Sequence, residues 1–281
     1  MDKLIKFRKI IQLAWAAATN GYLAGFMTGK IYNGPLKHMC VPGLNCYSCP
    51  GALFSCPIGG LQAVMGSRSF KFSFYVFGFL MTVGALCGRF ICGWLCPFGW
   101  IQELLNRIPF PKKITTFRFD KQLRYLKYAV LAVFVLALPL LLTDPYGQGE
   151  PFYCKLICPA GTLEAGLPLV ALNAALRSAA DLLYAWKAFI LAAILFISIL
   201  IYRPFCKYLC PLGAIYSLFN PISLQKLNFK AENCTDCGNC AHVCGMNVDP
   251  RHPHASLECI RCGDCQRACP VKALRLGIKN R

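Results

Sequence analysis

Residues 234–244 read CTDCGNCAHVC, and residues 259–270 read CIRCGDCQRACP. Both runs have the cysteine spacing of bacterial ferredoxins, in which three cysteines of one run and the fourth of the other hold each [4Fe–4S] cluster. The predicted ligands of cluster 1 are Cys234, Cys237, Cys240 and Cys269. The predicted ligands of cluster 2 are Cys259, Cys262, Cys265 and Cys244.

One corner departs from this pattern, because Cys269 is followed by Pro270 whereas Cys244 is followed by Gly245. The missing proline predicts a looser or more exposed corner. Zinc is the alternative metal, but zinc sites usually place a longer spacer between two CxxC pairs. We therefore expect residues 226–281 to form a small α+β domain of the bacterial 2[4Fe–4S] ferredoxin type.

The rest of the chain has the composition of a membrane protein. The 281 residues are 56% hydrophobic, and apolar runs approach the roughly 20 residues that a helix needs to cross a bilayer. The formal net charge of +18 treats the cysteines as neutral, and basic residues flank the apolar runs without any nucleic-acid motif. We expect no nucleic-acid partner. An all-α membrane domain of residues 1–225 is predicted, with four spans at about 10–28, 72–91, 125–143 and 186–202.

Basic residues predict the orientation of these spans, because cytoplasmic loops are enriched in Lys and Arg. The segment between spans two and three carries Arg107, Lys112, Lys113, Arg118, Lys121 and Arg124. The segment between spans three and four carries only Lys155 and Arg177 before Lys187. We therefore predict a multi-pass protein of the cytoplasmic (inner) membrane, with both termini and the ferredoxin domain in the cytoplasm.

The predicted membrane domain repeats itself. Span two leads into CGWLCPFG at 92–99, and span four leads into CKYLCPLG at 206–213. Span three leads into CKLICPAG at 154–161, and span one leads into a loop with Cys46, Cys49 and Cys56. The unit of a span, a cysteine loop, a second span and a CxxxCP motif is therefore used twice. This repeat predicts two tandem, pseudo-symmetric halves related by an axis near the membrane normal.

The CxxxCP motif suits half of a cluster site. Residues four apart lie on one side of a helical turn, so both sulfurs can face one centre. The proline keeps the second cysteine out of the α region and suits the first turn of a following helix. A cubane takes four thiolates, so two motifs are needed. The predicted ligands of cluster 3 are Cys92, Cys96, Cys206 and Cys210.

Cluster 4 is predicted on the opposite face. Its expected ligands are Cys154 and Cys158 with two of Cys46, Cys49 and Cys56, and the sequence leaves that choice open. Disulfides on an oxidising outer face are the alternative for these cysteines. The nearly uncharged segments 41–67 and 156–176 predict re-entrant helices that place this cluster at membrane depth. A hydrocarbon core of about 30 Å is too wide for one fast electron hop. Clusters placed at membrane depth would shorten the distance between them.

The four spans, the motifs Cys92–Cys96–Pro97 and Cys206–Cys210–Pro211, and the double ferredoxin run together resemble the NapH-type family of membrane ferredoxin-type proteins. The NosR C-terminal membrane module and the assembly factor CcoG share this arrangement. The resemblance implies an electron-transfer subunit of a membrane oxidoreductase complex of the quinol dehydrogenase type. Other redox subunits are the implied partners, and quinone or menaquinone is the candidate exchangeable redox partner. The additional outer cysteines depart from the family pattern and suggest an electron path across the membrane.

We therefore expect a membrane-bound electron carrier with four [4Fe–4S] clusters and no catalytic residue of its own. It would pass single electrons between cytoplasmic redox partners, the quinone pool and an outer-face partner. Arg89, Arg203 and Lys207 are expected to raise the potential of cluster 3. Two alternatives remain: a CcoG-like metal-reducing maturation factor for a respiratory enzyme, and a redox-sensing membrane regulator.

Overall fold

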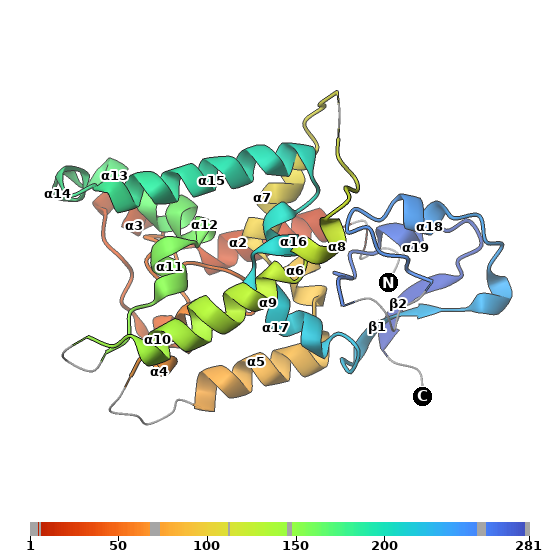
Figure 1. The fold of residues 1–281 in the computed structure, drawn as a ribbon, viewed down its shortest axis with the longest axis horizontal. Helices are drawn as coiled ribbons and strands as arrows, with labels where there is room; N and C mark the ends of the chain where they lie inside the picture. The colour runs from red at the N-terminus through yellow and green to blue at the C-terminus, as the bar shows by residue number, and fades with distance from the viewer. Residues whose placement is uncertain are drawn as a thin grey trace.

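A computed structural model describes residues 5, 7–67, 74–111, 113–144, 148–251 and 257–278. Helices up to residue 219 form one elongated body, and the C-terminal strands and short helices form a smaller unit at one end of it (Figure 1). The expected start of span two at residues 72 and 73 lies outside the described residues.

The elements follow the repeat predicted from the sequence. The first half contains α2 (Arg8–Thr19), α3 (Leu23–Thr28), η1 (Pro35–His38), α4 (Pro57–Met65), α5 (Phe74–Cys87), α6 (Phe90–Trp94) and α7 (Pro97–Asn106). The second half begins with α8 (Asp120–Leu123), α9 (Leu126–Val130), η2 (Leu131–Ala137) and α10 (Leu138–Leu141). It continues with α11 (Phe152–Leu156), α12 (Pro159–Gly161), η3 (Thr162–Gly166), α13 (Leu167–Leu172), α14 (Ala174–Ser178), α15 (Leu182–Leu200), α16 (Pro204–Tyr208) and α17 (Pro211–Phe219).

Two helices in the described part of the chain are long and apolar enough to cross a membrane. They are the continuous run Asp120–Leu141 of 22 residues and α15 of 19 residues. Helix α5 is apolar but has only 14 described residues. The first expected span is divided into α2 and α3, because Asn20 and Gly21 interrupt the helix. Four spans are therefore not confirmed.

The outer faces of these helices are apolar and exposed. Phe74 on α5, Leu141 on α10, and Leu182 and Phe189 on α15 are among the most exposed large side chains. Soluble proteins rarely expose contiguous apolar surface on this scale. The surface is instead suited to contact with lipid, as expected of a membrane protein.

Helices of each half pack against helices of the other half. Helix α7 of the first half packs against α15 of the second, while α17 of the second half packs against α5 of the first. At their junction the rings of Phe98 and Phe205 meet edge-on, with centroids 5.1 Å apart. One hydrophobic core therefore joins the halves, and cysteines of both predicted membrane sites are part of it.

The C-terminal unit is built on a two-stranded antiparallel sheet of β1 (Gln225–Phe229) and β2 (Leu274–Ile278). The short elements η4 (Ala231–Asn233), α18 (Asn239–His242) and α19 (Asp264–Ala268) carry the cysteine runs. Ile5 is buried in the same small core as Leu227 and Leu276. Ile5 therefore lies at the ferredoxin end of the molecule, which carries β1 and β2 (Figure 1).

The ferredoxin unit lies directly against the helical body at α6. A Cβ atom at Gly93 would lie 2.3 Å from the carbonyl oxygen of Ile260, so only glycine permits this approach. The adjacent Trp94 donates its Nε1–H to the carbonyl of Arg261 at 3.0 Å. The Arg261 guanidinium in turn donates to the carbonyl of Asn220 at 2.8 Å.

We predict that Gly93→Ala destabilises this contact, because the new methyl group overlaps a backbone carbonyl. Such overpacking costs about 1–3 kcal/mol. The matched control is Gly78→Ala on α5, where an added Cβ meets nothing within 4 Å; it should be neutral or stabilising by up to about 1 kcal/mol. Thermal unfolding in detergent measures both variants. Equal melting temperatures for the two would contradict the close contact at Gly93.

Candidate iron–sulfur sites

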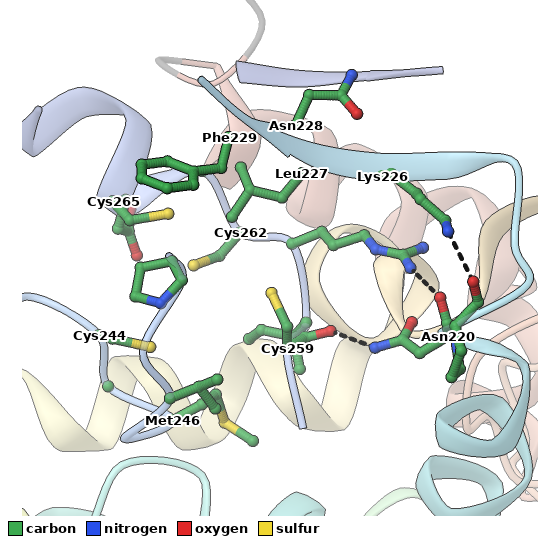
Figure 2. Close-up of a pocket in the computed structure, with 18 of the residues that line it drawn as sticks. Asn220, Lys226, Leu227, Asn228, Phe229, Cys244, Met246, Cys259, Cys262 and Cys265 are labelled. Atoms are coloured by element: carbon green, nitrogen blue, oxygen red, sulfur yellow. Dashed lines mark hydrogen bonds between the residues drawn. The ribbon is translucent and has the colours of Figure 1, made fainter. Parts of the chain in front are cut away.

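The cysteines predicted for cluster 2 surround a cavity of about 350 Å³ between the ferredoxin unit and the helical body. The sulfurs of Cys244, Cys259, Cys262 and Cys265 point toward its interior (Figure 2). Burial raises the pKa of the Cys262 and Cys265 thiols. These thiols therefore hold their protons until a metal displaces them.

A second cavity gathers the cysteines predicted for cluster 1. Its lining includes Cys234, Cys237, Cys240 and Cys269. In both cavities the fourth cysteine comes from the other run, which is the crossed arrangement expected from the spacing. Cys237 is exposed, so this set reaches the protein surface.

The expectation of a loose corner at Cys244 is wrong. A Cβ atom at Gly245 would lie 2.7 Å from the ring of Tyr202, so this corner is covered by the helical body. Tyr202 is held there by its hydroxyl, which donates to Glu103 at 2.6 Å. Glycine replaces the usual proline because the tyrosine ring occupies the space beside it.

Four of the five membrane-part cysteines that precede a proline share one local structure. Cys56, Cys96, Cys158 and Cys210 are extended, and each precedes a helix whose first residue is the proline. At two of them the glycine three residues later donates its backbone N–H to the cysteine sulfur, at 3.3 Å for Cys210 and 3.4 Å for Cys158. Cys158 and Cys210 thus cap their helices through their sulfurs.

The two cysteines of each CxxxC motif do not share one helical turn, because the second lies outside the α region, as its following proline predicts. Cys92 lies in α6, which ends before Cys96, and Cys206 lies in α16, which ends before Cys210. The proline prevents the second cysteine from continuing the helix. Each motif is therefore a helix–turn–helix corner that brings its two sulfurs toward the other half.

The cysteines predicted for cluster 3 are brought together and buried. Cys92, Cys96, Cys206 and Cys210 are each less than 10% exposed, and every pair of them interacts electrostatically. Two arginines cross between the halves beside them. Arg203 donates to the carbonyl of Cys92, and Arg89 donates to the carbonyl of Cys206 at 3.1 Å.

The cysteines predicted on the opposite face are brought together only in part. Every pair among Cys46, Cys56, Cys154 and Cys158 interacts electrostatically. Cys49 lies beside Cys46, to whose carbonyl its backbone N–H donates at 3.1 Å, but its sulfur lies 3.7 Å from the side-chain oxygen of Asn20. The proline after Cys49 starts no helix, whereas the proline after Cys56 starts α4.

These sets fit clusters in chemistry, since each supplies four thiol groups around one centre. Within the described residues, no three His, Cys, Asp or Glu side chains converge as ligands of a single metal ion would. A cubane binds each of its four cysteines through a different iron, so its ligands stand further apart than those of one ion.

Comparisons with known proteins support the iron–sulfur character of the chain. A family model described as a 4Fe–4S binding domain matches residues 72–117, 128–167 and 183–230, and a second model with the same description matches residues 256–275. An uncharacterized protein of Methanocaldococcus jannaschii is 31% identical over 205 residues, which cover 69% of this chain and 74% of the relative. The chain belongs to the NapH-type family of ferredoxin-type membrane proteins.

Two further relatives have names. The ferredoxin-type protein NapH of Haemophilus influenzae is 24% identical over 215 residues, covering 71% of this chain and 66% of NapH. The regulatory protein NosR of Pseudomonas aeruginosa is 31% identical over 192 residues, covering 64% of this chain but only 24% of NosR. No solved structure matches significantly. The predicted family and the iron–sulfur character are thereby confirmed.

In this NapH-type protein, one carboxylate that the sequence did not single out joins two of the cysteine sets. Glu258 precedes Cys259 and pairs with Arg89 at 2.5 Å and with Lys127. The same Arg89 donates to the carbonyl of Cys206. Burial raises the pKa of Glu258, but the two cations outweigh this effect and hold the pKa below its usual value. No spacing pattern marks Glu258, because its partners are distant in sequence.

We predict that Glu258→Gln loosens the ferredoxin unit from the helical body, because it leaves buried Arg89 and Lys127 without their counter-charge. Removing one partner of a buried ion pair costs about 3–5 kcal/mol. Hydrogen–deuterium exchange at residues 257–262 should increase.

The matched control is Glu150→Gln, which removes an exposed ion pair with Lys155 and should cost about 0–1 kcal/mol. Unchanged exchange at residues 257–262 in Glu258→Gln would show that these ion pairs do not hold the docked unit.

Proposed function

We propose that this NapH-type protein is a membrane-bound electron carrier with four [4Fe–4S] clusters. It passes single electrons between cytoplasmic redox partners, the quinone pool and an outer-face partner. Residues 226–281 would form the ferredoxin domain, and residues 1–225 would cross the membrane four times, with both termini in the cytoplasm. A [4Fe–4S] cluster supplies one-electron chemistry when bound, and its potential responds to charge and to hydrogen bonds at its sulfurs.

The observation that carries this proposal is the order of the four cysteine sets along the molecule. The set containing Cys237 reaches the surface. The set containing Cys259 lies against the helical body, where Asn220 donates to the Cys259 carbonyl at 2.9 Å. The sets of clusters 3 and 4 follow inside the body. A carrier that only anchored a ferredoxin would have no use for the last two sets.

Cysteines of the two membrane sets belong to one buried core, which also contains Tyr153 and Tyr216. Sites that share one core support a path that crosses the membrane in short steps, as re-entrant segments would allow. In the proposed topology, α4 and α11–α13 are those segments, and the interrupted α2–α3 pair and α5 are the two shorter spans.

The proposal is tested by iron and acid-labile sulfide per chain on anaerobically purified protein, with EPR after stepwise reduction. Four cubanes predict about sixteen irons. Cys96→Ser and Cys210→Ser should each lose about four irons and keep the ferredoxin signals, because their set is separate from those of the C-terminal unit.

Cys87→Ser is the matched control, since Cys87 belongs to none of the four sets, and it should retain all the iron. About eight irons in the wild type would reduce the protein to a membrane-anchored ferredoxin. Loss of every cluster in Cys96→Ser would contradict separate sites.

A further inference from the structure

A polar side chain recurs six residues after each membrane-part cysteine whose following proline begins a helix. These residues are Gln62, Gln102, Glu164 and Tyr216, which follow Cys56, Cys96, Cys158 and Cys210. Six residues place the side chain nearly two turns into the helix that the cysteine caps. All four reach across to the opposite half of the molecule, Tyr216 through its hydroxyl, which donates to the carbonyl of Pro42 at 2.8 Å.

Gln102 makes two hydrogen bonds to the other half. Its Nε2–H₂ lies 3.3 Å from the sulfur of Cys206, and its Oε1 accepts the backbone N–H of Phe205 at 3.1 Å. The side chain is completely buried. Both ends of the amide are therefore used, and its orientation is fixed by the backbone bond.

Gln62 repeats this arrangement at the opposite face. Its Nε2–H₂ lies 3.2 Å from the sulfur of Cys154, and its Oε1 accepts the backbone N–H of Tyr153 at 2.9 Å. This side chain is also completely buried. Atom for atom, Cys154 therefore corresponds to Cys206, and Cys56, which precedes Gln62, corresponds to Cys96.

Glu164 makes a contact of the same kind from the second half to the first. Its Oε2 accepts the backbone N–H of Cys46 at 2.7 Å, so the second half holds a cysteine of the first. The ideal Cβ position of Gly161 lies 3.5 Å from the sulfur of Cys46 and 3.8 Å from that of Cys158. Cys46 therefore faces Cys158 across the boundary between the halves.

We propose that the outer site is a second copy of the inner site, with Cys46, Cys56, Cys154 and Cys158 as its four ligands and Gln62 in the position of Gln102. This inference rests on the four-cluster carrier proposed above. Both glutamines are positioning residues: each orients the first cysteine of a CxxxCP motif and directs an N–H toward its sulfur. Cys49 is not a ligand.

The N–H of a buried amide stabilises negative charge on a ligand sulfur, and hydrogen bonds to sulfur raise the potential of an iron–sulfur cluster. Because each glutamine serves one site, its removal should affect one potential only. A glutamate at the same position could still accept the backbone N–H but could not donate to the sulfur when ionised. The glutamate variant therefore separates positioning from donation.

The ligand assignment is tested by iron per chain and EPR on Cys46→Ser, Cys56→Ser and the matched control Cys49→Ser. We expect the first two variants to lose about four irons and Cys49→Ser to lose none. If Cys49→Ser loses four irons while Cys46→Ser or Cys56→Ser retains all of them, the assignment is overturned. If the wild type itself holds about twelve irons, the outer cluster of the proposed function fails instead, which is a distinguishable result.

The glutamines are tested by EPR-monitored redox titration, with the signals assigned by Cys96→Ser and Cys158→Ser. Gln102→Leu should lower the midpoint potential of the inner cluster alone, and Gln62→Leu that of the outer cluster alone. Gln102→Glu and Gln62→Glu should retain iron better than the leucine variants, because the backbone bond remains, yet still show lowered potentials. Unchanged potentials in all four variants with full iron content would overturn the role of the glutamines.

Discussion

The proline that follows each second cysteine is the constraint on which both membrane sites depend. It holds Cys96 and Cys210 in extended conformations and begins α7 and α17 directly after them. A cysteine in that position can cap the new helix with its sulfur, because the N–H groups of a first helical turn have no partner within the helix. The backbone therefore already directs donors at the sulfurs before any side chain contributes.

Much of this could be predicted from the sequence because cysteine spacing and proline placement are local. The structure brings together the cysteines of each ferredoxin set and those of the set of Cys92, Cys96, Cys206 and Cys210, while their roles as cluster ligands stay predictions. The choice between Cys49 and Cys56 could not be made, because both precede a proline. The helix that Pro57 starts, and that Pro50 does not, separates them, as do the contacts of Gln62 on that helix. Glu258 was missed because its ion pairs span more than a hundred residues.

Hydropathy was a weaker guide than spacing. The expected first span contains Asn20 and Gly21, and Asn20 donates its amide to the carbonyl of Ala16, which competes with continued helix. In the third span the π-helical turn η2 comes before Pro139, whose missing N–H interrupts the hydrogen-bond ladder. A hydropathy averaged over many residues changes little when one side chain bonds to the nearby backbone. Hydropathy therefore could not predict where each span begins and ends, or where a helix is interrupted.

Each half of the helical body supplies hydrogen-bond acceptors to the other, so the sites form only when both halves are packed together. Arg89 and Arg203 are both completely buried, and each donates to a cysteine carbonyl of the opposite half. A buried guanidinium without acceptors is costly, so each arginine depends on groups outside its own half. Arg203 pairs with Glu103 of the first half, and Arg89 pairs with Glu258 of the ferredoxin unit. The same holds for Gln102, whose amide is bonded to the second half at both ends. The contacts that dock the two halves therefore also orient the cysteines. The polar groups that make the interface specific are the groups that orient the sulfurs.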